Sequence, residues 1–267
     1  MFRLSKHCFL LYNTLQKGSV KMENRYASRI EKVQMSSIRV VMEKVEKLRS
    51  QGKSVVSLCA GEPDFNTPEG IKKATIEALN DNQTHYSSNR GYLGLRKKVA
   101  HLLKKQTTID YDSDTEIIMT CGCSEAINNV CQAFINKDDE VIIFTPAFVS
   151  YQNTVLLCQG IPVEIPLKLS LGFQIDIEEV KNKITKKTKM IILNNPNNPT
   201  GAVYQKETLE QLCKLARENN ILILADEIYN QLDYENQYVS IASFENMKDY
   251  TIIVNGFSKA YAMTGWR

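Results

Sequence analysis

Two ionisable side chains of complementary charge each follow a short apolar run of the sequence. Asp226 comes directly after the run Ile221–Ala225, and Lys259 lies just beyond the run Thr251–Val254. A carboxylate at the end of a buried strand needs a cationic or hydrogen-bonding partner. A lysine is ordinarily a solvated surface cation, but one just beyond a buried strand, facing a site that also holds an acid and an aromatic, is a better candidate for a functional residue.

Polar and aromatic residues follow two further apolar runs. Pro146 ends the run Glu140–Phe144 and leaves Phe148 near its carboxyl end, where an aromatic ring can stack on a planar ligand. The alternative for Phe148 is a place in the core. The segment Asn194–Gly201 contains two prolines and four side-chain amides, which favours an irregular loop rich in hydrogen-bonding groups.

A glycine turn before a helix supplies a candidate anion site. Gly122 separates the apolar run Glu116–Thr120 from an apolar-periodic segment that contains Ile127, Val130 and Phe134. The free backbone N–H groups and the positive dipole end of such a helix attract anions. Taken alone, this pattern is also typical of an ordinary turn.

The elements that must position these residues alternate along the chain. Six short β-branched runs predict strands buried on both faces of a parallel sheet: Val55–Cys59, Glu116–Thr120, Glu140–Phe144, Met190–Leu193, Ile221–Ala225 and Thr251–Val254. Apolar residues at helical spacing predict helices over Ile71–Leu79, after Pro68, and Leu209–Ala216. We therefore expect an α/β, doubly wound sheet with its ligands at the carboxyl ends of the strands.

Composition places the chain among ordinary globular proteins. Its 267 residues include 33 Lys and Arg and 30 Asp and Glu, and 43% of them are hydrophobic. A net charge of only +3 gives no electrostatic reason to expect binding to nucleic acid or to a membrane surface. No apolar stretch approaches the roughly 20 residues of a membrane helix.

The cysteines and histidines do not form a metal or disulfide pattern. The seven cysteines include no CxxC pair, and the three histidines stand apart. We interpret the cysteines as reduced thiols, expect a cytoplasmic protein, and predict no metal site. Residues 1–21 are basic and free of acids. We interpret them as a disordered leader or a start assigned ahead of Met22, with an organellar presequence as the alternative.

Four motifs in order resemble one enzyme family. The segments LCAGEPDFNTP, NNPNNPTGAVY, ADEIY and NGFSKAYAMTGWR are similar to those of the class I/II pyridoxal-phosphate-dependent aminotransferases of fold type I. The resemblance runs from about Arg25 to Arg267. It implies a mixed, mostly parallel large-domain sheet, an amino acid and a 2-oxo acid as substrates, pyridoxal 5′-phosphate as cofactor, and a homodimer.

The resemblance also implies roles for individual residues. Lys259 matches the lysine that forms a Schiff base with the cofactor and carries the proton. Asp226 matches the acid that pairs with the pyridine nitrogen. Tyr229 and Asn198 match the residues that hydrogen-bond the ring's 3′ oxygen, and Phe148 matches the stacking aromatic.

Other matches concern the phosphate and the substrate. The implied phosphate cradle comprises Gly122, Cys123, Ser124, Ser258 and Arg267, and Tyr86 of a neighbouring subunit reaches it. Gly61 and Asn198 are the implied substrate-binding residues. Two departures stand out. Gly256 replaces the Ser or Thr of many relatives, and Cys123 stands where Gly, Ala or Ser is common.

The end of the resemblance suggests a C-terminally truncated chain. Relatives continue past Arg267 into the rest of the large domain and a small domain, which carries the arginine that clamps the substrate carboxylate. We predict a leader over 1–21, an N-terminal arm and part of an incomplete small domain over 22–54, and an incomplete cofactor-binding large domain over 55–267. We expect little activity from this chain alone.

Three other functions were weighed against the aminotransferase. A P-loop ATPase would use Ile221–Glu227 as its acidic strand and Gly52-Lys53-Ser54 as the end of its phosphate loop, but Lys47 replaces the first required glycine and a strand is expected after Ser54. A carbon–sulfur β-lyase would use the same lysine and aspartate. A non-catalytic truncated remnant is the third alternative.

Overall fold

The computed structural model describes residues 27–33, 37–58 and 61–267. The backbone divides between Val33 and Gln34 into two units, each taken separately below. The first contributes a short 3-10 helix, Ser28–Lys32. The leader predicted over residues 1–21 lies outside the described residues.

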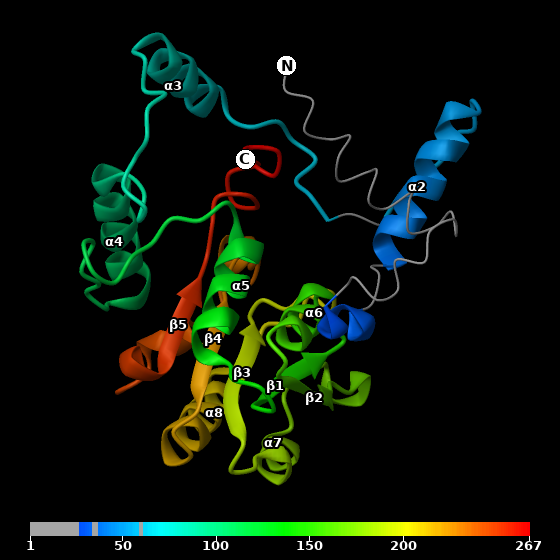
Figure 1. The fold of residues 1–267 in the computed structure, drawn as a ribbon, viewed down its shortest axis with the longest axis vertical. Helices are drawn as coiled ribbons and strands as arrows, with labels where there is room; N and C mark the ends of the chain where they lie inside the picture. Colours follow the sequence, from blue (N-terminus) through cyan, green and yellow to red (C-terminus); the bar gives the residue numbers. More distant parts are fainter. Residues whose placement is uncertain (1–26, 34–36, 59–60) are drawn as a thin grey trace. The chain divides into compact units, whose positions relative to one another are not determined.

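A five-stranded parallel sheet forms the centre of the second unit (Figure 1). Its strands are β1 Glu140–Thr145, β2 Ile161–Pro166, β3 Thr188–Asn194, β4 Leu222–Asp226 and β5 Thr251–Val254. Their order across the sheet is β2-β1-β3-β4-β5, and every neighbouring pair is parallel. The predicted doubly wound α/β class is confirmed. The expected mixed sheet has no antiparallel pair among the described strands.

Four of the six predicted strands are confirmed, as β1, β3, β4 and β5. The other two predictions are wrong where the structure describes them, since residues 55–58 and Glu116–Thr120 form no strand. Val56, Leu58 and Ile118 are largely exposed, so their β-branched and apolar side chains are not covered by a neighbouring element of this chain. Strand β2 was not predicted, because Pro162 and Pro166 interrupt its apolar pattern. Prolines are tolerated at the edge of the sheet, where β2 lies.

Alternating side chains of the strands build a core on each face of the sheet. On one face, Ile191 and Ile223 pack with α7 Ile177–Lys183 and α8 Lys206–Glu218. On the other, Ile192 and Leu224 pack with α5 Cys123–Phe134 and α6 Ser150–Leu157. Near-continuous apolar strands are therefore buried from both sides, as a parallel sheet requires.

The remaining α-helices precede the sheet in the chain. They are α2 Ser37–Ser50, α3 Glu69–Asn80 and α4 Leu93–Thr107. Both predicted helices are confirmed, as α3 and α8, and Pro68 directly precedes α3. Short 3-10 helices at Leu169–Leu171, Asn230–Leu232, Ile241–Ser243 and Lys248–Tyr250 complete the connections. Within the described part of the chain, no helix has the length and apolar character needed to cross a bilayer.

Candidate active site

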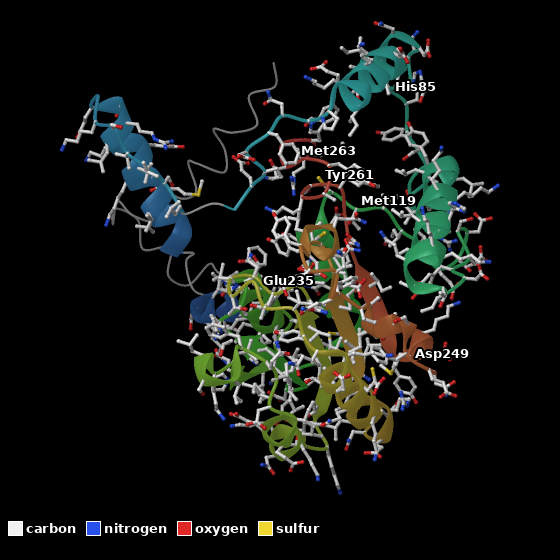
Figure 2. All side chains as sticks on the ribbon, turned by 180° about the vertical axis from the view of Figure 1, so that it is seen from behind. His85, Met119, Glu235, Asp249, Tyr261 and Met263 are labelled. Carbon is white, nitrogen blue, oxygen red and sulfur yellow. The ribbon has the colours of Figure 1, made fainter. Side chains whose placement is uncertain are left out.

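The carboxyl ends of β3, β4 and β5 bring polar residues into register. Asn194 pairs with Asp226 across β3 and β4, and Asp226 pairs with Val254 across β4 and β5. The chain then leaves each strand in the same direction, carrying Asn198, Tyr229 and Lys259 in the connections that follow. Figure 2 labels Tyr261 and Met263 in the segment that carries Lys259. The expected gathering of functional groups at this edge follows from the parallel order.

Asp226 is a buried acid with specific partners. Its side chain is 4% exposed. Tyr151 Oη donates a hydrogen bond of 2.7 Å to Oδ2, and the backbone N–H of Ile228 donates one of 3.3 Å to Oδ1. Burial raises the pKa of Asp226, and both hydrogen bonds oppose that rise. A cationic partner would stabilise this carboxylate, because a nearby positive charge lowers the pKa of an acid.

Lys259 is half-buried beside Tyr229 and Gly61. Its amine lies 5.8 Å from the centre of the Tyr229 ring and donates a hydrogen bond to the carbonyl oxygen of Gly61. Burial lowers the pKa of the Lys259 amine and Arg267 adds to this effect, whereas Glu62 opposes it. A lowered pKa increases the neutral, nucleophilic fraction of a lysine.

The start of α5 lies against the end of the chain. Gly122 precedes the helix with φ of +87°, a conformation that favours glycine. A Cβ atom at this position would lie 2.7 Å from Arg267 Nη2, so the missing side chain also admits the guanidinium. The first N–H groups of a helix have no acceptor within the helix. Together with Arg267 they form a positive cradle suited to a phosphate.

Cys123 connects this cradle to the acid and the lysine. Burial, together with the charge of Asp226, raises the pKa of its thiol to about 12, and the charges of Arg267 and Lys259 oppose the shift. The Cys123 thiol is thus close enough to Asp226, Arg267 and Lys259 to respond to the charge of each. A Cβ atom at Gly256 would lie 3.1 Å from Cys123 Sγ and 3.3 Å from Ile228 Cδ1. The two departures noted in the sequence therefore fit each other, since the thiol occupies space beside a glycine.

The substitution Gly256→Ser tests this fit. It should reduce the free energy of unfolding by about 1–3 kcal/mol, because the added side chain crowds Cys123. In the Cys123→Ala background the same substitution should cost much less. Urea unfolding measures both effects, with Gly70→Ser as control, since a Cβ at Gly70 meets nothing within 4 Å. Equal costs of Gly256→Ser in the two backgrounds would contradict the packing argument.

Two further predicted residues are anchored by neighbouring side chains. Asn198 Nδ2 donates a hydrogen bond of 3.2 Å to Tyr229 Oη, so the pair expected to share one ligand atom is already joined. The Phe148 ring meets the Tyr151 ring edge to face, with centroids 5.6 Å apart, and is partly buried. Tyr151 therefore supports both Phe148 and Asp226.

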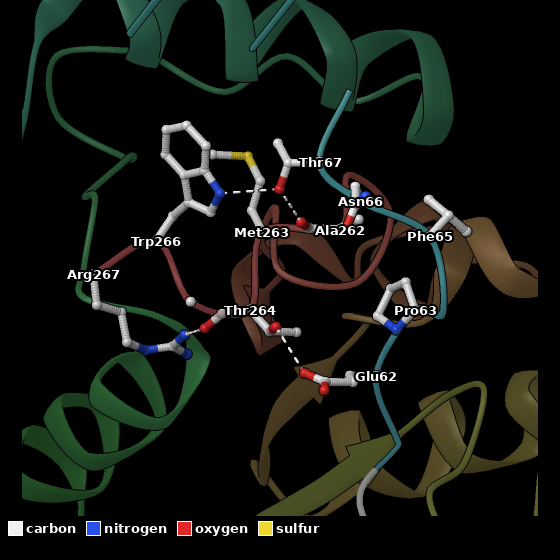
Figure 3. Close-up of a pocket in the computed structure, with 11 residues that line it drawn as sticks. Glu62, Pro63, Phe65, Asn66, Thr67, Ala262, Met263, Thr264, Trp266 and Arg267 are labelled. Atoms are coloured by element: carbon white, nitrogen blue, oxygen red, sulfur yellow. Dashed lines mark hydrogen bonds between the residues drawn. The ribbon is translucent and has the colours of Figure 1, made fainter. Parts of the chain in front are cut away.

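A pocket of about 910 Å³ adjoins these groups, lined by residues from 62–67 and 262–267 (Figure 3). Thr264 Oγ1 donates 3.0 Å to Glu62 Oε2, and Trp266 Nε1 donates 3.0 Å to Thr67 Oγ1. These bonds hold the segment after Gly61 against the segment after Lys259. Arg267 belongs to the lining and so connects the pocket with the cradle at α5.

The structure does not bring every predicted residue into this group. Tyr86 is fully exposed, and Ser124 is exposed in the first turn of α5. Ser258 is partly buried, and its backbone carbonyl accepts a 3.1 Å bond from Met263 N. The sequence analysis missed Tyr151 and Asn194 as site residues. A tyrosine shortly after a strand end was the only available signal for Tyr151, whose contact with Asp226 spans 75 positions.

The acid next to Asp226 faces the opposite side of the sheet. Glu227 is 3% exposed, and Ser240 Oγ donates a 2.7 Å hydrogen bond to its Oε1. Burial, with the charge of Asp226, raises the pKa of Glu227 from 4.5 to about 7, and the hydrogen bond from Ser240 opposes the rise. Glu227 is thus a second buried acid directly behind the site.

Glu227 should make stability depend on pH. The folded chain holds its proton up to about pH 7, whereas the unfolded chain releases it near pH 4.5, so stability falls as pH rises between these values. The difference in unfolding free energy between the wild type and Glu227→Gln should change by about 3 kcal/mol from pH 4 to pH 8. Urea unfolding at several pH values measures it, with Glu207→Gln on the surface of α8 as control. A pH-independent difference would contradict the burial argument.

The sequence of this chain is similar to those of known proteins. The model of the family "Aminotransferase class I and II" matches residues 53–267. A probable aspartate/prephenate aminotransferase of Aquifex aeolicus is 40% identical over 92% of this chain and 63% of its own length. An aromatic-amino-acid aminotransferase of Thermococcus litoralis is 42% identical over 90% of this chain and 61% of its own length.

Solved structures agree with these matches. The aspartate aminotransferase from Thermus thermophilus with maleate superposes with a TM-score of 0.87 at 40% identity, over 91% of this chain and 63% of that chain. An alanine aminotransferase from Pyrococcus furiosus gives a TM-score of 0.85 at 34% identity, over 91% of this chain and 62% of that chain. The chain thus spans about three fifths of the length of these relatives.

Proposed function

Because this chain belongs to the aminotransferase class I and II family, we propose that its full-length gene product moves an amino group from an L-amino acid to a 2-oxo acid. One observation carries the proposal. Adjacent parallel strands lead to a buried carboxylate at Asp226 and to a lysine of lowered pKa at Lys259. This pair matches the needs of covalent amine chemistry on an aromatic cation.

The residues present fit pyridoxal 5′-phosphate, which members of this family use as cofactor. Asp226 is a buried acid whose Oδ atoms already accept two hydrogen bonds but lack a cationic partner among the contacts described above. Gly122 and Arg267 form the cradle for the phosphate. Phe148 and the Asn198–Tyr229 pair supply an aromatic face and donors for the ring.

Each residue has a distinct task in the proposed reaction. When bound, the cofactor supplies a carbonyl carbon for the amine and a ring that accepts electrons. Asp226 holds a proton on the ring nitrogen, and Tyr151 holds Asp226. Lys259, as a neutral amine, would be the residue that holds the cofactor at this carbonyl carbon, and it would move the proton of the substrate α-carbon. Asn198 and Tyr229 hold the ring's 3′ oxygen.

The phosphate and the substrate engage the rim of the site. Backbone N–H groups at Cys123 and Ser124, with the turn at Gly122 and the side chains of Ser258 and Arg267, would hold the phosphate. Gly61 and Asn198 contact the substrate. The full exposure of Tyr86 supports a role in the site of a second subunit, and therefore a homodimer.

The names of the relatives specify the amino acids aspartate, aromatic amino acids and alanine, and the 2-oxo acid prephenate. The proposed donor substrate is one of these amino acids. Glutamate and 2-oxoglutarate are the proposed amino-group exchange pair. The free cysteines among the described residues, at positions 121, 123, 131, 158 and 213, support a reducing compartment such as the cytoplasm.

Substrate assays on the full-length gene product test this function. The protein is loaded with pyridoxal 5′-phosphate, given glutamate and a panel of 2-oxo acids, and followed by the 2-oxoglutarate and new amino acids that form. Stoichiometric exchange is expected. Release of pyruvate with ammonia or sulfide from cysteine-like substrates, without exchange, would assign the β-lyase reaction instead. No reaction with any substrate would indicate a non-catalytic remnant.

A further inference from the structure

Asn194 is a buried amide that joins two residues of the site. It is the last residue of β3 and is 4% exposed. Its Nδ2 donates a 2.9 Å hydrogen bond to the backbone carbonyl of Asp226, and its Oδ1 accepts a 2.7 Å hydrogen bond from the backbone N–H of Asn198. Both functions of one amide are therefore used, and each contacts a different residue of the site.

The two contacts reach residues that are assigned to different atoms of the proposed ring. Asp226 is the partner of the ring nitrogen, and Asn198 contacts the 3′ oxygen together with Tyr229. The N–H of Asn195 also donates to the Asp226 carbonyl, at 3.2 Å, so that carbonyl has a second donor. The Asn198 N–H has Asn194 Oδ1 as its described acceptor. Loss of the amide should therefore displace Asn198 more than Asp226.

We propose that Asn194 is a positioning residue that fixes the distance between Asp226, the acid at the ring nitrogen, and Asn198, the amide at the 3′ oxygen. This inference rests on the proposed function. Only an amide offers a donor and an acceptor on one short planar group. An ionised aspartate keeps the acceptor and loses the donor, and alanine loses both. Replacing Asn194 with aspartate and with alanine should therefore have effects of different kinds on the site, which the loss of packing alone does not predict.

The loop provides a matched control. Asn197 is 6% exposed, and its amide also makes two side-chain hydrogen bonds, donating 3.3 Å to Tyr204 Oη and accepting 2.8 Å from Thr200 Oγ1. Neither partner belongs to the proposed cofactor site. Asn197→Ala thus removes a comparably buried amide from the same loop without releasing Asp226 or Asn198.

Cofactor binding to the full-length gene product separates the two roles. Asn194→Ala should raise the dissociation constant of pyridoxal 5′-phosphate about tenfold, which is the effect of one lost hydrogen bond. The visible absorbance of the bound cofactor changes with pH, and the midpoint of this titration should shift by about half a pH unit or more. Asn194→Asp retains the acceptor for Asn198, so hydrogen exchange at the Asn198 N–H should stay slower than in Asn194→Ala. Asn197→Ala should reduce stability in urea and leave the midpoint at its wild-type value.

A double variant and an exchange measurement complete the test. If Asn194 acts through Asn198, then Asn194→Ala combined with Asn198→Ala should have the midpoint of Asn198→Ala alone. In the cofactor-free protein, Asn194→Ala should speed hydrogen exchange at the Asn198 N–H, whereas Asn197→Ala should not. Equal midpoints and exchange rates in Asn194→Ala and Asn197→Ala would overturn the inference. A wild-type protein that binds no pyridoxal 5′-phosphate would instead refute the proposed function, and the exchange result would still decide the role of Asn194.

Discussion

Replacing Lys259 with alanine is expected to lower turnover of the full-length gene product by about 10⁴-fold, the upper range for removal of a positioned proton-transfer group. The reason is that one amine serves as both nucleophile and base, and no other lysine contacts Tyr229 and Gly61 among the described interactions. Initial rates measure the loss. Borohydride treatment after addition of cofactor should leave a covalent label on the Lys259 peptide of the wild type and none on this variant.

A second substitution separates charge from nucleophilicity. Lys259→Arg keeps the positive charge, but a guanidinium stays protonated at neutral pH and cannot act as the amine. It should therefore be as inactive as Lys259→Ala. Lys214→Ala, on the exposed side of α8, serves as the neutral control. Wild-type rates in either Lys259 variant, or a label on a different lysine, would refute the assignment.

Replacing Asp226 with alanine should lower turnover by about 10²–10³-fold, the range for loss of one preorganised electrostatic partner. The label on Lys259 should remain, because the amine itself is intact. The variant should also lose about 1–3 kcal/mol of stability, since Tyr151 Oη would be left buried without its acceptor. Asp226→Asn keeps the size and an acceptor for Tyr151 but removes the charge, so its turnover should fall similarly with a smaller loss of stability.

The Tyr151→Phe variant isolates the support of Asp226 from its charge. It removes the 2.7 Å hydrogen bond to Oδ2 and leaves the carboxylate with the Ile228 N–H. We expect a loss of turnover of about tenfold or less, the effect of one hydrogen bond. Rates are compared at saturating cofactor in all three variants. Unchanged turnover in Asp226→Asn would show that the charge has no role in the reaction.

The residue types that follow each apolar run are a local property of the chain, and the sequence shows them directly. The run Thr251–Val254 predicted β5, and the residues after each confirmed strand predicted the carboxyl-end cluster. The spacing of apolar residues and the residues that form turns determine the position of a strand over a few residues of sequence. By contrast, Glu116–Thr120 has strand-like composition and no strand partner, and β2 contains two prolines at a sheet edge.

The sequence by itself determined that a lysine, an acid and an amide-rich loop each follow an apolar run, because such runs and the residues that end them can be recognised over a few positions. Only the tertiary structure decided which atoms meet. The Asp226 carboxylate receives its hydrogen bond from Tyr151, the Cys123 thiol lies against Gly256, and Asn194 links β4 to the loop of Asn198. These contacts join residues far apart in the chain, and their geometry depends on strand register and packing, which no local pattern encodes.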